Sequence, residues 1–377
     1  MKRAAWNRCA KLATAIVLAI AAGTWTVAQL REAEDARRDV QEVARMTQKM
    51  KTTCIGRFLI DMPTETEFEI TRPRISGLDI SSIDESEADF QVRLVQREAL
   101  LRATPDRLGG NGNVESISEV KTDNGVVGKI FVHGRKVTEG TQARGFEIER
   151  YRYEGVAIEA LVHGKGMSFD ISASDYDPAK VENLAKLVAK LVPNPDNQVP
   201  TGPGFCIDRA WFRDPLTAHQ GEQLIMYAGF PNHPDMDLML ILAAGNKPDK
   251  QTLLQRDAEV HAGMSLSEKL RVSNLRAKPR TIDGLTGDEL VTRVHEYNDA
   301  IVFGFRWEVN GTEEDVFIPH LSLSMNTGKG NHVPVPSSLT QDGGLALWDK
   351  ILSSVRYHHP RAGQATPGVS RQPVSQR

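Results

Sequence analysis

The chain has 377 residues, 40% of them hydrophobic and 25% charged, which is the balance of a folded protein long enough for two domains. Its 46 basic and 49 acidic residues leave a net charge of only −3. This excludes a strong global field that would draw the chain to nucleic acid or to anionic lipid.

Residues 1–30 have the pattern of a signal peptide or an N-terminal membrane anchor. An apolar run, "LATAIVLAIAAGTWTVA", follows four basic residues, so the chain beyond it is expected outside the cytoplasm. Thr26-Val27-Ala28 offers a site for cleavage. However, Trp6 and Trp25 would lie about 28 Å apart on a helix, close to the thickness of the bilayer core, which favours a retained anchor. Cys9 precedes the apolar run, so it is not in the place of a lipid-attachment cysteine.

The next segment, 31–53, is highly charged: "EAEDARRDVQEVARMTQKMK" covers 32–51. A thin apolar stripe at three-four spacing predicts a helix. We interpret it as a solvated spacer, with a short dimer-forming coiled coil as the alternative.

A repeated line opens the folded part of the chain. "CIGRFLIDMP" at 54–63 returns as "CIDRAWFRDP" at 206–215. Further echoes follow in the same order, and the intervals Gln96 to Gly125 and Gln255 to Gly284 are equal. These echoes are "LVQREA" and "LLQRDA", "NGVVG" and "DGLTG", "YRYE" and "FRWE", "SFDISA" and "LSLSMN", and the closing "ENLAKLVAKLV" and "LALWDKILSSV". Ordered echoes of this kind predict a tandem duplication of one domain.

Each repeat has the signals of strands and helices together. Asn-Gly and Asp-Gly mark turns before alternating strands such as "GFEIERYRYEG" and "AIVFGFRWEVNG". The "LVQREALLRA" and "QTLLQRDAEVHAGM" segments predict one helix in each repeat. A closing helix in each would bury Leu184, Leu187, Val188 and Leu191, or Leu347, Trp348, Ile351 and Val355. The predicted fold class is therefore α+β, a tandem duplication of an antiparallel sheet covered by helices.

Prolines and glycines at 193–204 predict a linker between a first domain at 54–192 and a second at 205–360. The tail at 361–377 has almost no large apolar residue and is predicted to be disordered. Cys54 and Cys206 occupy equivalent places in an oxidising compartment. Sequence alone leaves open whether they form a disulfide or serve as two small buried side chains.

Recognisable catalytic motifs are absent from the sequence. It contains no Gly-x-Ser-x-Gly elbow, no His-Glu-x-x-His helix and no Cys-x-x-Cys pair. "NTGKGN" near Gly328 lacks the spacing of a phosphate loop, and "GGNGN" at 109–113 lacks that of a dinucleotide loop. We therefore predict no catalytic, cofactor-binding or metal site and no enzyme activity.

Three weaker candidates have plain structural alternatives. His233, Asp235 and Asp237 could ligate a metal, but a polar loop before a strand explains them equally. His358 and His359 follow the last helix and are expected to meet its terminal carbonyls or solvent. "RYRYEG" and "FRWEV" mix arginine with aromatic residues, which suits either a partner-binding face or cross-strand pairs within a sheet.

The openings "CIGRF…P" and "GFCID" resemble the immunity-protein family that protects bacteria from class-four phospholipase effectors of the type VI secretion system. The resemblance spans both predicted domains in the right order. It implies a periplasmic protein of two α+β domains that grips its cognate lipase like a claw and keeps the active site closed to lipid. It gives no contact residue in this sequence, because the gripping surface differs between pairs.

Two other classes of function stay open at this stage. One is a periplasmic enzyme whose catalytic residues form no recognisable motif, and the other is a passive structural protein of the envelope. The absence of motifs and the paired domains favour a clamp that binds a partner protein, because two linked contacts strengthen each other.

Overall fold

The computed structural model describes residues 37–38, 40–105, 112–145, 147–214, 221–313 and 315–358. The predicted anchor at 1–30 and the predicted tail at 361–377 lie outside these residues, so both stay predictions. Within the described residues, no helix is both long and apolar enough to cross a membrane.

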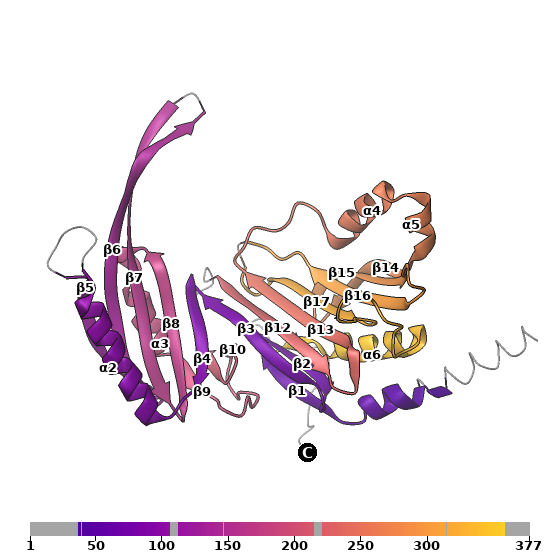
Figure 1. Cartoon of the computed structure of the whole chain (residues 1–377), viewed down its shortest axis with the longest axis horizontal. Coiled ribbons are helices and arrows are strands. Elements are labelled where there is room, and N and C mark those ends of the chain that lie inside the picture. Colours follow the sequence, from indigo (N-terminus) through magenta and orange to yellow (C-terminus); the bar gives the residue numbers. More distant parts are fainter. Residues whose placement is uncertain are drawn as a thin grey trace, which may run out of the picture.

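Two halves of the chain repeat one order of elements (Figure 1). The first half contains β1 Met50–Ile55, β2 Phe58–Pro63, β3 Glu67–Ile75, β4 Leu78–Asp84, α2 Glu87–Ala103, β5 Val114–Lys121, β6 Val127–Arg144, β7 Glu147–Gly164, β8 Met167–Tyr176, the 3₁₀ turn η1 Pro178–Lys180, α3 Glu182–Val188 and β9 Leu191–Pro193. The second half contains β10 Gly204–Ile207, β11 Ala210–Arg213, β12 Glu222–Phe230, β13 His233–Ala244, α4 Leu253–Gly263, α5 Leu266–Arg271, β14 Val272–Ile282, β15 Leu285–His295, β16 Ile301–Val309, β17 His320–Asn326, α6 Gln341–Ser354 and β18 Arg356–Tyr357.

One twelve-stranded sheet runs through both halves, in the order β14-β15-β16-β17-β13-β12-β3-β4-β8-β7-β6-β5. The order on one side of the β12–β3 junction repeats the order on the other side, strand for equivalent strand. β12 and β3 pair antiparallel at seven positions, from Glu222 opposite Ile75 to Gly229 opposite Glu67. The α+β fold and the tandem duplication are thus confirmed, and the two halves share one continuous sheet.

The equivalent turns support the same conclusion. Gly125 has φ +77° and precedes β6, while Gly284 has φ +80° and precedes β15, and glycine adopts this left-handed conformation without strain. Gln96 and Gln255 lie on α2 and α4, which precede these turns in each half. The equal spacing seen in the sequence therefore marks equivalent places in the fold.

The two halves exchange their first hairpins. β2 of the first half pairs with β18 of the second, and β11 of the second half pairs with β9 of the first. Between the two hairpins, Gly56 and Cys206 exchange backbone hydrogen bonds, and Cys54 forms a disulfide with Cys206 at a Cα–Cα distance of 5.8 Å. The open question about the cysteines is thus decided in favour of a disulfide between the halves.

A buried ion pair reinforces this junction. Arg57, in the turn of the first hairpin, donates through Nε and Nη2 to Glu222 of β12 at 2.8 and 2.7 Å, and through Nη1 to Asp214 at 3.0 Å. Burial disfavours the charge of Arg57, but these carboxylates outweigh it and raise the pKa of Arg57. Burial raises the pKa of Glu222 in spite of the nearby guanidinium.

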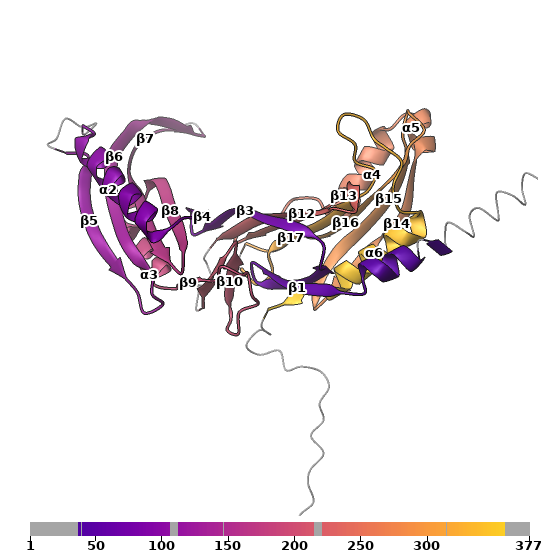
Figure 2. The ribbon, with the colours of Figure 1, turned by 60° about the horizontal axis from the view of Figure 1, so that its bottom comes forward.

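One apolar core lies on one face of the sheet and is covered by α3, α6 and the two hairpins (Figure 2). The alternating strands send every second side chain into this core. The eight apolar residues predicted for the closing helices are all buried: Leu184, Leu187, Val188, Leu191, Leu347, Trp348, Ile351 and Val355.

Two of the sequence echoes do not match residue for residue in the structure. Tyr151 and Tyr153 of "YRYE" are exposed on an extension of β7, whereas Phe305 and Trp307 of "FRWE" are buried in the core. Alternating aromatic and charged residues are common to strands in general, so this match reflects strand pattern and not common position. "SFDISA" and "LSLSMN" are equivalent strands matched one residue out of register, because Phe169 and Leu321 both face the core.

The predicted spacer at 31–53 is only partly a helix and is not fully solvated. Its described residues 37–38 and 40–46 are helical, but β1 already begins at Met50. Val43 and Met46 are buried in the core, and Glu42 bonds to His233 of β13 at 3.0 Å. The apolar stripe of this helix therefore packs against the second half.

Candidate binding surface

The second face of the sheet is covered at its two ends and open in the middle. Leu161 of β7 and Phe131 of β6 project from this face into a cluster with α2. At the other end, the α4 backbone NH of Leu254 donates to Asp288 of β15 at 3.2 Å. In Figure 2 the central strands form the narrow middle of the molecule. α2 stands above one end of the sheet, and α4 and α5 stand above the other.

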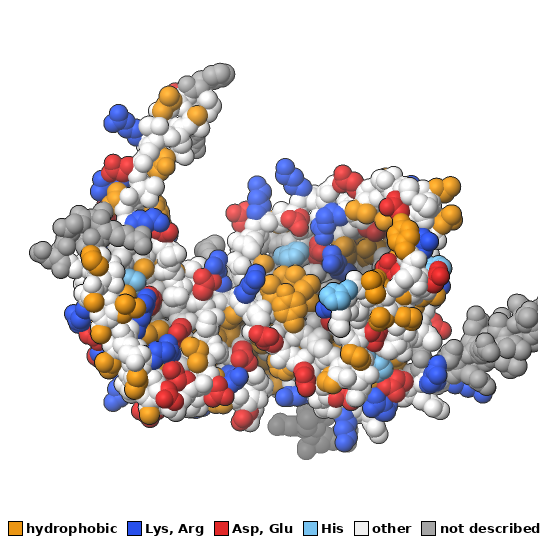
Figure 3. All heavy atoms as spheres, viewed as in Figure 1, with side chains coloured by type: hydrophobic (Ala, Val, Ile, Leu, Met, Phe, Trp, Pro, Cys, Tyr) orange, Lys and Arg blue, Asp and Glu red, His pale blue; other side chains and the backbone are white. Residues whose placement is uncertain are grey.

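Four side chains form the apolar middle of this open face. The register places Ile225 of β12 opposite Ile241 of β13, and Tyr227 opposite Met239. Their neighbours on the next strands are polar, with Thr71 and Glu69 on β3 and Ser322 and Ser324 on β17. Figure 3 shows hydrophobic side chains gathered over β12 and β13 in the hollow of the molecule, with charged side chains around them. We call the open face of β3, β12 and β13 the saddle.

An apolar centre with an exposed polar rim is the usual anatomy of a protein–protein interface, and the saddle has such a rim on its β3 side, whereas Ser322 and Ser324 of β17 are buried. Tyr227 is 49% exposed although it stands in the middle of a twelve-stranded sheet. Beside it, a groove of about 590 Å³ is lined by Glu67, Tyr227, Asp237 and Lys329 among others. The saddle therefore offers a recessed, mixed surface to a partner.

At the α2 end of the sheet, ion pairs join the helix to β7 and β8. Arg93 bonds to Asp170 at 2.8 Å, and Arg97 bonds to Glu159 at 2.8 Å. Burial opposes the charge of Glu159, but its hydrogen bonds from His133 and Arg97 hold its pKa at about 2, well below the usual value. These pairs fix α2 at one height above the sheet.

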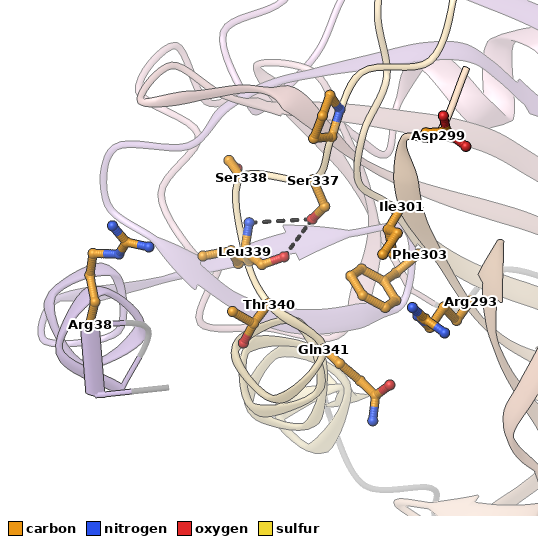
Figure 4. A pocket seen from close by; sticks show the side chains of 11 residues that line it. Arg38, Arg293, Asp299, Ile301, Phe303, Ser337, Ser338, Leu339, Thr340 and Gln341 are labelled. Atoms are coloured by element: carbon orange, nitrogen blue, oxygen red, sulfur yellow. Dashed lines mark hydrogen bonds between the residues drawn. The ribbon is translucent and has the colours of Figure 1, made fainter. Parts of the chain in front are cut away.

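A further cavity, of about 550 Å³, lies away from the saddle (Figure 4). Arg38 of the N-terminal helical segment lines one side, and Arg293 and Phe303 line the other, with Ser337 and Leu339 bonded to each other between them. Its lining residues include no histidine, cysteine or lysine, and Asp299 is their single carboxylate. These residues form no recognisable nucleophile–base pair or metal-ligand set.

The sequence candidates for a metal site are structural anchors. His233 bonds to Ser338 at 2.9 Å, Asp235 accepts from the backbone NH of Gly328 at 3.0 Å, and Asp237 bonds to Lys329 at 2.8 Å. The three residues therefore hold the loop after β17 against β13. In the described part of the chain, one trio of ligand-type atoms converges, from Cys54, Cys206 and His358, and both of its sulfurs belong to the disulfide.

His358, the first residue after β18, contacts the junction between the hairpins. His358 donates its backbone NH to the carbonyl of Arg57 at 2.8 Å, and its Nε2 lies 2.7 Å from the carbonyl of Pro200. These two bonds tie the end of the chain's second half to the hairpin junction. His359 lies outside the described residues.

The sequence did not reveal the residues of the saddle. The sequence feature at this place is "LMLILAA" in β13, a nearly continuous apolar run. A strand that is covered on one face only is expected to alternate apolar and polar residues. Such a run predicts cover on both faces, but the structure leaves the face of Met239 and Ile241 partly exposed.

In the part of the chain that the structure describes, these features define a duplicated protein whose sheet offers a recessed, open surface to a binding partner. Family models agree with this class: the N-terminal domain of Tle cognate immunity protein 4 matches residues 51–171, and its C-terminal domain matches residues 198–360. The chain belongs to this immunity-protein family. The resemblance seen in the sequence is thereby confirmed.

Solved structures show the same fold. The immunity protein TplEi of the type VI secretion system of Pseudomonas aeruginosa, complexed with "L" peptide, is 22% identical, with a TM-score of 0.64 over 82% of this chain and 98% of that chain. A chain of the Tle4–Tli4 complex is 21% identical, with a TM-score of 0.65 over 82% of this chain and 98% of that one. No curated protein sequence matches the chain significantly.

Proposed function

We propose that this chain is an immunity protein that binds a cognate phospholipase effector of the type VI secretion system on the saddle and silences it. The observation that carries the proposal is the apolar middle of the saddle, open to solvent between two raised ends of one sheet. Membership of the family and the likeness to a chain of the Tle4–Tli4 complex support the class of partner.

The saddle would act as a preformed clamp. Lipases work at a lipid surface, so a protein that covers the apolar rim of the active site keeps it from lipid. Because the halves share a sheet, a disulfide and exchanged hairpins, they are already fixed at the right separation. A preorganised site does not lose the freedom of two separate domains on binding. This replaces the expectation of avidity between two domains joined by a short, proline-stiffened linker.

The chain itself would have no enzymatic activity and would act in the periplasm. The basic and apolar pattern of residues 1–30 supports export, and retention of that segment would tether the protein to the inner membrane. The rival proposal of an undetected enzyme requires that the purified chain turn over a lipid, peptide or nucleic acid on its own. A passive envelope protein would bind no phospholipase.

The test uses the purified full chain and the phospholipase encoded beside its gene. Replacement of Ile241 by arginine, or of Tyr227 by arginine, should weaken binding at least about 30-fold, since a charge then enters a desolvated centre. Ala346→Arg, at an exposed position of α6 on the covered side of the sheet, is the matched control and should bind like the unaltered chain. If the unaltered chain neither binds nor inhibits this phospholipase, the proposal is wrong.

A further inference from the structure

The hairpin of β6 and β7 projects far beyond the body of the first half (Figures 1 and 3). Both strands have 18 residues, whereas their equivalents in the second half, β15 and β16, have 11 and 9. The shared fold therefore closes its core without the outer part of this hairpin. We call residues 136–145 and 147–154 the arm.

The arm is built to stand in solvent. On one face, Arg152 pairs with Glu139 across the strands and with Glu154 at 3.0 Å. On the other face, Tyr151 covers Gly140 so closely that a side chain there would collide with its ring. Isolated two-stranded hairpins are marginal in water, so such a ladder of cross-strand pairs is needed to keep the arm extended.

The tyrosine face of the arm continues the face that carries the saddle. Side chains alternate along a strand, so Tyr151 and Tyr153 lie on the same face of β7 as Leu161, which packs under α2. The two tyrosines are 40% and 45% exposed. Figures 1 and 2 show the arm leaning toward the second half.

The opposite end of the twelve-stranded sheet also exposes apolar side chains. α5 buries none of its residues, and Leu266 and Leu270, one helical turn apart, are 75% and 78% exposed. A capping box formed by Ser265 and Glu268 holds this short helix without help from a core. Two leucines held in this way toward solvent present apolar surface at this end of the sheet.

The area of the saddle shows why these ends are needed. Its three strands, paired over seven positions, cover about 14 Å by 23 Å, or about 300 Å². A stable protein complex buries about 800 Å² on each partner. A partner seated on the saddle must therefore extend beyond it, and the raised elements that it would meet at the two ends of the sheet are α2 with the arm and α4 with α5.

We propose that the arm and α5 are the recognition elements for the effector: Tyr151 and Tyr153 at one end, and Leu266 and Leu270 at the other, contact the same phospholipase molecule that occupies the saddle. This inference rests on the proposed function. It assigns selectivity for one effector to the arm and α5, which the duplicated core does not require. The saddle then supplies the contact surface that different effectors would share.

The test compares three variants of the full chain for binding to the phospholipase encoded beside its gene. The first shortens the arm by replacing residues 137–154, which include both tyrosines, with Asn-Gly, a two-residue turn that rejoins Lys136 and Gly155, which face each other across the strands. The second is Leu266→Ala/Leu270→Ala, at positions exposed enough to leave folding unchanged. The control is Val199→Ala, a partly exposed apolar residue between β9 and β10.

The short arm and the double leucine variant should each bind at least about 10-fold more weakly, with unchanged thermal unfolding, and Val199→Ala should stay within about twofold. Should both variants bind as tightly as the unaltered chain, the inference is wrong while the proposed function stands. Should the leucine variant instead dissociate a dimer of the chain and leave effector binding unchanged, α5 is a self-association surface and the inference is equally wrong. If the unaltered chain does not bind, both proposals fail.

Discussion

The arginine in the first hairpin turn offers a strong test of how the halves are joined. Arg57 is 6% exposed, and Glu222, its partner on β12, is fully buried. Removal of the guanidinium in Arg57→Ala leaves the buried carboxylate of Glu222 without its two charge-assisted bonds. Breaking a buried pair in this way costs about 3–5 kcal/mol, which is more than a 100-fold change in the folding equilibrium.

The duplication supplies the matched control. Arg209 occupies the equivalent turn of the second hairpin, but its side chain is 36% exposed and it meets Asp84, which is 80% exposed, at 3.2 Å. Arg209→Ala should therefore cost less than about 1 kcal/mol. Both substitutions remove a guanidinium group from equivalent hairpin turns. The difference between their losses of unfolding free energy therefore measures the effect of burial and of pairing with a buried carboxylate.

The assay is equilibrium unfolding in urea under oxidising conditions, followed by tryptophan fluorescence. Arg57→Ala should lower the free energy of unfolding by several times the loss seen for Arg209→Ala. Equal losses in the two variants would refute the idea that a buried ion pair of the first hairpin holds the halves together.

Three further predictions concern the junction and the ends of the sheet. Cys54→Ala/Cys206→Ala removes a bond that closes a separation of 152 residues in the chain, so unfolding should be easier by about 3–5 kcal/mol in urea; an unchanged midpoint would contradict this. Glu159 has its folded pKa lowered to about 2, so its contribution to stability is present above about pH 4.5 and is lost as the pH falls through about 2. After allowance for solvent screening this contribution is about 1–2 kcal/mol, and Glu159→Gln should be less stable than the unaltered chain at pH 7 by that amount, with the gap closing toward pH 2; a gap that does not vary with pH would show that the ion pair is not its source. Four glycines inserted between Thr201 and Gly202 should change effector affinity less than about twofold, because β3 and β12 already fix the halves, whereas a large loss would restore the linker model.

Local signals in the sequence predicted the repeated parts of the fold well. Asn124-Gly125 and Asp283-Gly284 mark the same turn because few residues other than glycine adopt a positive φ without strain. The closing helices were recognisable because Leu184 and Leu347 each begin a helical apolar stripe. Both signals depend on a few neighbouring residues.

The features that build the binding surface depend on distant partners. Nothing near Phe58 shows that its strand pairs with β18 some 300 residues later, because strand pairing leaves no local mark. Alternation in β12 shows that Met226 and Tyr227 face opposite sides, but not which side another element covers. The aromatic pattern at Tyr151 likewise indicates a strand and does not reveal that it leaves the body of the protein.

The central claim is that the effector occupies the saddle, and site-specific photocrosslinking tests it most directly. A benzophenone amino acid at position 227, in the middle of the saddle, is compared with the same group at position 199, between β9 and β10, each in the full chain mixed with the phospholipase. If the effector occupies the saddle, it forms an adduct at 227 and none at 199. Full inhibition with an adduct at 199 and none at 227 would contradict it.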